Sequence, residues 1–437
     1  MDYWGELNIN DEGHLVLGGC DAVLLAKEYG TPLFVMDENK IRETCRSYYK
    51  VIREKGIDAL VAYASKAFTN KSMCKIAAQE GLGLDVVSGG ELYTAVKAKF
   101  PMEKVYFHGN NKTKSEIAMA VEHGVGRIVA DNFEEIDLID KIAGRFKKKV
   151  NIQVRIKPGI EAHTHDYIKT GTDDSKFGLG IKDGQAILAI RQVLDSTNLE
   201  FAGIHCHIGS QIFELEPFKM AVDVMTDFIL KVKDKLGVKV SEANLGGGYG
   251  IHYLAEDEPL YPYQYVETIV EELIESCKGK NIDIPKMVIE PGRSIVGEAG
   301  TTLYEVGSVK EIPGIIKYAN VDGGLADNPR PALYQAEYTA VVANKASEKS
   351  EEKISIAGRT CESSDILIKD AFLPKVEAGD IIAVFSTGAY NYSMASNYNR
   401  LPIPAVVLVK DGKSDYMVKR QTYEDITKLD VISNWLK

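Results

Sequence analysis

The chain has 437 residues, of which 45% are hydrophobic and 26% charged, as expected of a globular protein with a sizeable core. Its formal net charge of −11 argues against nucleic acid or an anionic membrane surface as the main partner. No apolar run is long enough to span a membrane, and the length predicts two domains.

The N-terminal residues MDYWGELNIN are acidic and polar, and they have none of the features of a secretory signal peptide. The six cysteines form no CxxC pair and no zinc-ribbon spacing. We therefore expect free thiols in a reducing compartment, and we predict a cytoplasmic protein.

Eight short apolar runs recur along the chain before Arg293, and most are followed by a helical stretch. They span residues 59–63, 83–88, 104–109, 127–131, 150–156, 201–207, 241–248 and 286–292. Short buried strands that alternate with helices indicate a parallel sheet of βα units. The number of units, in about 250 residues, predicts an α/β fold of the (β/α)8 barrel type. An open doubly wound sheet is the alternative.

After Arg293 the pattern changes to short β-rich runs separated by turn residues. These runs span residues 301–312, 318–324, 338–345, 353–358, 380–387 and 404–412. Long helical patterns are nearly absent, which predicts a second, mainly antiparallel β domain. We predict that residues 36–298 form the barrel and that residues 1–35 with 299–437 form the β domain. The charged stretch 345–353 is interpreted as a solvated hairpin.

Polar and ionisable residues follow nearly every predicted barrel strand. A (β/α)8 barrel builds its active site at the C-terminal ends of its strands. Those ends carry Lys66, Asp85, Ser88, His108, Asp131, Arg155, His205, His207, Gly246, Gly247, Gly248, Glu290 and Arg293. A purely structural protein has no reason to gather such residues there, so we predict an enzyme.

The segments GGGYG (246–250) and EPGR (290–293) follow the last two strands and indicate a phosphate site. Barrels often bind phosphate with the loops after these two strands. Glycines let backbone N–H groups approach phosphate oxygens, and Arg293 adds a charge. A glycine triplet alone is more often a tight turn, so the two segments support the interpretation together.

A phosphate site, a lysine and a carboxylate at the strand ends suggest pyridoxal phosphate as the cofactor. This cofactor needs a lysine for its Schiff base and an acid beside its pyridine nitrogen. Lys66 provides the lysine and Glu290 the acid, while His207 can stack on the ring. Taken alone, Lys66 would be interpreted as a solvated loop residue, because lysine is usually exposed.

A metal site is the competing interpretation, because His205 and His207 lie on one face of a predicted strand. His163 and His165 form a second such pair. Neither pair has an obvious carboxylate ligand close in the sequence. A metal would also leave Lys66 and the two loop segments unexplained, so we predict no metal.

The residues that carry this chemistry belong to a set of motifs that resembles the diaminopimelate decarboxylase family, within the alanine-racemase-like fold type of pyridoxal-phosphate enzymes. The matching segments are YASKA, GLDVVSGGEL, FHGNNK, EAHTHDYIKTG with DSKFG, HCHIGSQI, NLGGGYGI, EPGRSIVGEAG, VDGGLADNPRPALY, CESSD and STGAYNYSMASNYN. They run in order from about residue 35 to residue 400. Phe68 stands where many relatives have asparagine, and no catalytic position is missing.

The resemblance implies a role for each matching residue. Lys66 is the Schiff-base lysine, His207 stacks on the ring, Glu290 pairs with the pyridinium nitrogen, and Asp85 and Arg155 support the lysine and the ring. The residues that the resemblance implies to hold the phosphate, or to lie against it, are Ser210, Gly246, Gly247, Gly248, Gly292, Arg293 and Tyr390. The residues that it implies to bind the substrate are Arg293, Arg330, Tyr334, Glu362 and Tyr390. Cys361 and Glu362 resemble a pair delivered across a homodimer interface, with the thiol as proton donor.

The activity implied by the resemblance is decarboxylation of meso-2,6-diaminopimelate to L-lysine and CO₂, the last step of lysine biosynthesis. Arg330 and Glu362 have charges that suit the distal carboxylate and ammonium of this substrate. Two alternatives remain open from the residues. One is a related decarboxylase or racemase acting on another basic amino acid, and the other is a non-catalytic pyridoxal-phosphate carrier. A carrier would resemble the barrel alone, which the β domain with Cys361 disfavours.

Overall fold

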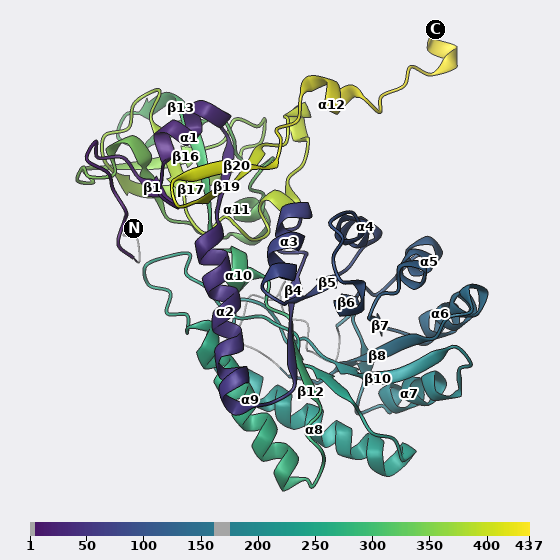
Figure 1. The fold of residues 1–437 in the computed structure, drawn as a ribbon. Coiled ribbons are helices and arrows are strands. Elements are labelled where there is room, and N and C mark those ends of the chain that lie inside the picture. The colour runs from purple at the N-terminus through teal and green to yellow at the C-terminus, as the bar shows by residue number, and fades with distance from the viewer. Residues whose placement is uncertain (1–4, 161–174) are drawn as a thin grey trace. The chain divides into compact units, whose positions relative to one another are not determined.

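The computed structural model describes residues 5–160 and 175–437 and divides into two compact units (Figure 1). The first, called the barrel unit, comprises Arg42–Ile251 and Glu258–Ile295. The second, called the β unit, comprises Met1–Ile41, His252–Asp257 and Val296–Lys437.

Eight parallel strands of the described barrel unit form a closed ring. In spatial order they are β4 (Ala59–Ala64), β5 (Gly83–Val86), β6 (Val105–Phe107), β7 (Arg127–Ala130), β8 (Val150–Lys157), β10 (Leu199–His205), β11 (Glu242–Asn244) and β12 (Lys286–Ile289). The ring closes because β12 pairs with β4 and β8 pairs with β10. A ninth short strand, β9 (Leu179–Gly180), pairs with β8. The predicted (β/α)8 barrel is confirmed, and the closed ring excludes the open doubly wound sheet.

Six of the eight strands end before the predicted runs do, whereas β4 and β8 each extend one residue beyond them. The run 241–248 contains only the three-residue strand β11, and the run 286–292 contains β12 and then leaves the sheet. The physical reason is the composition of these ends, because glycine, proline and charged residues favour loops over a buried ladder. The loops that result carry the candidate site residues.

Helices follow the strands and lie around the ring in Figure 1. They are α2 (Glu38–Lys55), α3 (Lys71–Gln79), α4 (Gly89–Lys97), α5 (Lys114–His123), α6 (Phe133–Phe146), α7 (Gln185–Asp195), α8 (Glu216–Leu236), α9 (Pro262–Gly279) and α10 (Arg293–Val296), with a 3₁₀ turn at Met102–Lys104. Several begin at a residue whose side chain accepts a bond from the first turn: Ser88 for α4, Thr113 for α5 and Asn132 for α6. Many polar residues at the strand ends therefore serve as helix caps.

The opposite end of the barrel is closed by a polar network around Glu242, the first residue of β11. Its carboxylate accepts bonds from Arg127 Nε at 3.0 Å, Tyr106 Oη at 3.2 Å and Gln153 Nε2 at 3.0 Å. Every polar partner of this buried carboxylate comes from a different strand. The network therefore stabilises the barrel at the end away from the candidate site.

Lys112 is a buried lysine that ties the loop after β6 to the neighbouring unit of the barrel. Its Nζ donates to the carbonyls of Gly109 at 2.8 Å and Val129 at 2.7 Å, and it lies 3.1 Å from both oxygens of Glu135. Burial lowers the pKa of Lys112, and the Glu135 carboxylate opposes this shift. The motif residue Lys112 thus has a structural role in holding the loop that begins at His108.

Replacing Lys112 with methionine is expected to destabilise the protein by about 3–5 kcal/mol, because Glu135 would remain as a buried charge without its partner. The measurement is the midpoint of urea unfolding followed by circular dichroism. Lys114→Met, at an exposed lysine two positions later, is the matched control. Equal midpoints for the two variants would contradict the structural role of the Lys112–Glu135 pair.

The β unit is built on a nine-stranded sheet that is mainly antiparallel, as predicted. The path is β17 (Ile366–Leu373), β16 (Glu352–Ala357), β14 (Ile316–Val321), β13 (Gly300–Ile312), β3 (Leu33–Asp37), β19 (Ala405–Lys410) and β20 (Lys413–Val418), and β18 (Ile381–Val384) joins β13 to β15 (Ala340–Val342). Among the described strand pairs of the β unit, only β14–β16 and β3–β19 are parallel. A separate hairpin joins β1 (Val16–Leu17) and β2 (Cys20–Asp21).

The short helices of the β unit are α1 (Ala22–Tyr29), α11 (Arg330–Tyr334) and α12 (Tyr423–Thr427), with 3₁₀ turns at Ala343–Lys345, Tyr392–Met394, Tyr398–Arg400 and Asn434–Leu436. Apolar side chains from β3, β13, β18 and β19, among them Val35, Leu303, Ala383 and Val407, pack on α1 to form its core. β3 and β18 are buried on both of their faces, so they are central strands of this unit.

Two expectations for the β unit differ from the structure. The edge strands β17 and β20 were not predicted, because edge strands lack the two-sided burial that produces a clear apolar pattern. The predicted hairpin at 345–353 is wrong, because β15 and β16 are not paired with each other. The charged residues instead lie in a connection between strands that pair with different neighbours.

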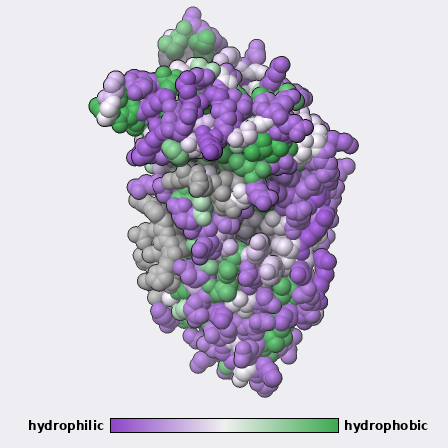
Figure 2. Space-filling view, turned by 90° about the vertical axis from the view of Figure 1, so that its left-hand side faces the viewer, coloured by the Kyte–Doolittle hydropathy of each residue, from purple (hydrophilic) through white to green (hydrophobic). Residues whose placement is uncertain are grey.

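Hydrophilic side chains cover most of the face in Figure 2, with hydrophobic ones in small separate groups. Within the described ranges, no helix has both the length and the apolar character needed to cross a lipid bilayer.

Candidate active site

Lys66 lies in the loop directly after β4, at the C-terminal end of the barrel strands. The loop after β12 packs closely here, because Ala64 N donates to Pro291 O at 3.0 Å. A Cβ added to Gly292 would lie 2.9 Å from the Cβ of Ala64 and 3.2 Å from that of Ala67. The small residues around Lys66 are thus required by the close approach of these two loops.

Asp85, the third residue of β5, lies beside the lysine. Its Oδ2 is 3.7 Å from Lys66 Nζ, and the aspartate side chain is 1% exposed while the lysine side chain is 40% exposed. Neither carboxylate oxygen of Asp85 has a hydrogen bond to a described residue. Burial raises the pKa of Asp85, and the His108 ring and the Lys66 ammonium oppose the shift. The lysine therefore meets a buried acid that can hold its proton.

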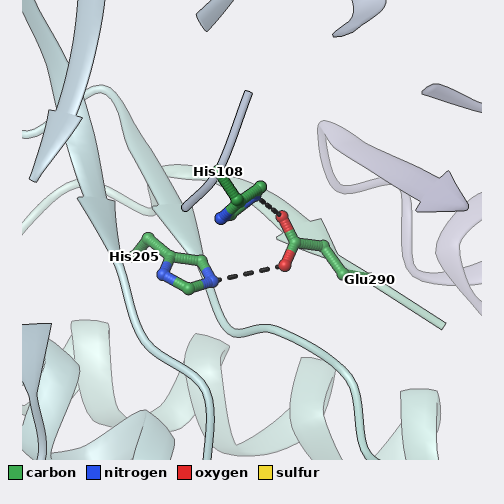
Figure 3. A group of neighbouring side chains, drawn as sticks. All are labelled: His108, His205 and Glu290. Carbon is green, nitrogen blue, oxygen red and sulfur yellow. Dashed lines mark hydrogen bonds and ion pairs between the residues drawn. The ribbon is translucent and has the colours of Figure 1, made fainter. Parts of the chain in front are cut away.

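Glu290 is the centre of a buried hydrogen-bonded group at the end of β12 (Figure 3). His108 Nε2 lies 2.7 Å from Oε1, and His205 Nε2 lies 3.2 Å from Oε2. Asn244 Nδ2 donates to Oε1 at 2.6 Å. Burial acts to raise the pKa of Glu290, but His108 and His205 hold it well below its usual value. The carboxylate is therefore ionised inside the barrel.

His205 and His207 occupy different surroundings, although they are separated by one residue. Burial lowers the pKa of His205 to about 3, so its ring is neutral and donates to Glu290 through Nε2. His207 is half-buried, and its Nδ1 accepts a bond from Gly247 N at 3.4 Å. Burial lowers the pKa of His207 well below its usual value. Its neutral ring suits stacking against an aromatic cofactor.

The glycine loop after β11 lies between the loops that follow β10 and β12. Gly246 and Gly248 have φ of +68° and +116°, which favour glycine. A Cβ on Gly246 would lie 2.6 Å from Cys206 O, and one on Gly247 would collide with the carbonyl of Glu290. These glycines are therefore required by the close approach of the backbone to the neighbouring loops.

Arg293 adds a positive charge at the same end of the barrel. It is buried, and its Nη2 donates to Ser210 Oγ at 3.0 Å, so the loops after β10 and β12 meet through these two side chains. A guanidinium, a hydroxyl and a glycine-rich backbone are the donors that a phosphate group needs. Arg293, Ser210 and the glycine loop therefore fit a site for the phosphate of the cofactor.

Arg155, near the end of β8, lies in the barrel but outside the Glu290 group. Its Nε is 3.9 Å from Asp131 Oδ1, and its guanidinium lies 4.4 Å from the centroid of the Phe177 ring. These contacts hold the side chain in place, as expected for a residue that supports the site without donating to Glu290.

In the β unit, Arg330 begins α11 and is 8% exposed. Its Nη1 donates to Tyr253 Oη at 2.8 Å and to Tyr338 Oη at 2.9 Å, and its guanidinium lies 5.0 Å from the Tyr253 ring centroid. Among the described residues it forms no ion pair. A buried cation surrounded by hydroxyls and rings is suited to receive an anion.

Cys361 and Glu362 are exposed at the tip of a loop in the β unit. Asp365 shapes this loop, because its carboxylate accepts bonds from Thr360 N at 2.8 Å and Leu325 N at 2.7 Å. The 3₁₀ turn Tyr398–Arg400 holds the tip: Asn399 Oδ1 accepts from Cys361 N at 2.8 Å, and Tyr398 Oη donates to Glu362.

Tyr334 and Tyr390 are half-buried residues of the β unit. Tyr334 is the last residue of α11, the helix that begins with Arg330. Tyr390 has a φ of +62°, so its backbone adopts the left-handed conformation that L-residues rarely occupy. Both lie in segments that the motifs VDGGLADNPRPALY and STGAYNYSMASNYN cover.

The competing metal interpretation relied on a different pairing of histidines. The structure groups His205 with His108 and Glu290, and His207 is not part of that group. The 2.7 Å between His108 Nε2 and Glu290 Oε1 is a hydrogen-bond distance, with a proton between the atoms. A second group consists of the exposed Glu12 and the half-buried His14 and Asp21. His163 and His165 lie outside the described residues.

Sequence reasoning did not assign the contacts of His108, His205 and Asn244 with Glu290. The available signal was position, because each is at or beside the end of a barrel strand and is polar within an apolar run. Position did not reveal the partner, since strands far apart in sequence meet across the barrel.

Comparisons with known proteins place this geometry in context. A family model described as pyridoxal-dependent decarboxylase, pyridoxal binding domain, matches residues 38–297. A diaminopimelate decarboxylase of Bacillus subtilis (strain 168) is 53% identical over 422 residues, which cover 97% of this chain and 96% of that protein. One of Staphylococcus aureus (strain COL) is 47% identical and covers 95% of this chain and 97% of that protein.

A solved structure of the same family has a similar fold. The crystal structure of a diaminopimelate decarboxylase from M. jannaschii with L-lysine has a TM-score of 0.92 and 36% identity, and it covers 99% of both chains.

Proposed function

This chain belongs to the diaminopimelate decarboxylase family, and from that premise we propose how its residues carry out the reaction. The activity is pyridoxal-phosphate-dependent decarboxylation of meso-diaminopimelate to L-lysine and CO₂. It makes the protein a carboxy-lyase of lysine biosynthesis. The other decarboxylase and racemase activities that the residues alone left open are not favoured. The single observation that carries the proposal is the group around Lys66, Asp85 and Glu290 at the barrel mouth.

The barrel residues fit pyridoxal 5'-phosphate. When bound, the cofactor supplies an aromatic ring that takes up the electron pair left by the departing CO₂. Lys66 would hold it covalently, and Ser210, the three glycines Gly246, Gly247 and Gly248, Gly292, Arg293 and Tyr390 would hold its phosphate. Glu290, ionised and buried, stabilises a protonated ring nitrogen. His207 lies against the ring, and Asp85 and Arg155 support it.

Asp85 controls the proton of Lys66. The lysine must lose its proton to react and must regain it when the substrate amine replaces it. Asp85 Oδ2, 3.7 Å from Nζ, is the buried group that can accept and return that proton. Burial raises the pKa of Asp85, which favours its taking up that proton.

Arg330 selects a substrate with a distal carboxylate. Its buried guanidinium has hydroxyl partners but no carboxylate among the described residues. A bound carboxylate would supply the missing anion, and a guanidinium can bind it with two parallel bonds. Arg293 and Tyr334 complete the distal-carboxylate site, Tyr390 also contacts the substrate, and Glu362 binds the distal ammonium. Ornithine and arginine have no distal carboxylate, which disfavours them as substrates.

Cys361 supplies the proton that replaces CO₂. It is exposed, unlike the other five cysteines, which are buried. A buried thiol would be inert, whereas an exposed thiol held at its backbone by Asn399 can reach a substrate. We assign the Cys361–Glu362 loop to the active site of a partner subunit, so the functional unit is a homodimer with shared sites.

An exposed apolar segment at the C-terminus supports the homodimer. Leu429, Val431 and Trp435 are 88%, 89% and 85% exposed. Asp430 forms an ion pair with Arg400 of the turn that holds the Cys361 loop. Exposed apolar residues of this kind mark a protein interface, and the Arg400–Asp430 ion pair connects them to the turn that holds the Cys361 loop.

The proposal also includes the domain boundaries and the cellular compartment of the protein. Residues 36–298 bind the cofactor, which the match of the family model to 38–297 supports. Residues 1–35 and 299–437 complete the active site across the dimer. The six free cysteines, five of them buried, support a reducing compartment, the cytoplasm.

The test is L-lysine formation from meso-diaminopimelate by the purified protein, with and without added pyridoxal phosphate. Lysine is expected only when the cofactor is bound. Ornithine and arginine, offered under the same conditions, should give no amine product. Protein that holds the cofactor and yields no lysine would contradict the substrate and leave the cofactor assignment in place.

A further inference from the structure

We propose that His108 is a positioning residue, which holds the carboxylate of Glu290 as an anion for the ring nitrogen of the cofactor. This inference rests on the proposed function, because it needs Glu290 to face that nitrogen. Three side chains contact the carboxylate: His108 and Asn244 on Oε1, at 2.7 and 2.6 Å, and His205 on Oε2, at 3.2 Å. Figure 3 shows the two rings directed at opposite oxygens.

The proton in the His108–Glu290 contact belongs to the histidine. A bond of 2.7 Å between an imidazole nitrogen and a carboxylate oxygen requires a proton on one of them. His108 and His205 keep Glu290 ionised against the effect of burial, so Nε2–H of His108 donates. His205 is a neutral donor, and its Nδ1 has no hydrogen bond to a described residue.

His108 also lies between two buried carboxylates. Its Nε2 is 3.8 Å from Asp85 Oδ1, and the other Asp85 oxygen is 3.7 Å from Lys66 Nζ. Burial and the charge of Glu290 both act to raise the pKa of Asp85, so Asp85 is the carboxyl of this pair that is suited to take up a proton, such as that of Lys66. With the N–H of His108 bonded to Glu290, the charge stays on Glu290. His108 thus links the acid beside the lysine to the acid beside the ring nitrogen.

The surrounding structure fixes the ring in this position. The backbone N–H of His108 donates to Val86 O at 2.8 Å, at the end of the neighbouring strand β5. The imidazole lies edge-on to that of His205, with centroids 4.7 Å apart and planes at 66°. Lys112 anchors the loop that follows through Gly109 O. The backbone on both sides of His108 is therefore anchored and its ring packs against His205, which suits the side chain to positioning another group.

Two substitutions of His108 separate positioning from packing. Glutamine can place an N–H where Nε2 stands, whereas asparagine is one carbon shorter and leaves Oε1 without that donor. The readouts are the dissociation constant of pyridoxal phosphate and the visible absorbance of the bound cofactor as a function of pH. We expect His108→Asn to weaken cofactor binding by about 10- to 100-fold, the value of a hydrogen bond to a charged group. His108→Gln should stay closer to the parent protein.

The same substitutions of His108 are then made in a protein that also carries Glu290→Gln. If His108 acts through Glu290, they should no longer change the affinity, because the carboxylate that they position is gone. An equal loss of cofactor affinity with and without Glu290→Gln would overturn the inference and leave His108 as a packing residue. A folded His108→Asn protein with the parent's affinity and absorbance would overturn it too. Folding is checked by circular dichroism. A parent protein that binds cofactor but forms no lysine would contradict the proposed substrate alone.

Discussion

Lys66→Ala is expected to reduce lysine formation at least about 1,000-fold, because this residue carries the covalent step. Another lysine near the strand ends, Lys112, is buried and paired with Glu135, so it cannot substitute. The measurement is the rate of L-lysine formation from meso-diaminopimelate with saturating pyridoxal phosphate. The visible absorbance of the cofactor should also revert to that of the unattached form.

The control for this variant is Lys71→Ala, at an exposed lysine that begins α3. It removes the same charge within a few residues and should leave the rate unchanged. Lys66→Arg is the second variant, because it keeps a cation beside Asp85 but cannot form the covalent link. Substantial turnover by either Lys66 variant would contradict the role assigned to this residue.

Subunits that carry Lys66→Ala and Cys361→Ala, each inactive alone, are expected to form an active mixed dimer. One of its two shared sites then has both Lys66 and Cys361, so about half of the parent activity per dimer is expected. The two chains are co-expressed with different affinity tags, and the mixed dimer is isolated by sequential capture. Lysine formation is then measured per mole of dimer.

The reciprocal pairing is the decisive control. A chain with both substitutions, paired with an unmodified chain, has no site with Lys66 and Cys361 together if the sites are shared. It should be inactive, whereas sites within single chains would leave it half active. An inactive mixed dimer of the single variants would likewise contradict the shared site.

Much of the barrel was predictable because its signal is local. A buried strand of a parallel sheet has a continuous apolar sequence, and each of the eight predicted runs overlaps one barrel strand. The positions of Lys66, Asp85 and Glu290 followed from the rule that barrel sites lie at the ends of strands. The edge strands β17 and β20 escaped detection, because a strand that is paired on one side carries a weaker pattern.

The apolar runs predicted the fold class, and the residues at the strand ends suggested the cofactor. The reaction followed only from the resemblance of ordered motifs to a known family. Only the tertiary structure decided that His108, His205 and Asn244 meet at Glu290, and that Arg330 is a buried cation facing hydroxyls. The physical reason is that hydrogen bonds depend on distances of about 3 Å between side chains. Residues 108 and 290 come within that distance only when the ring of strands closes.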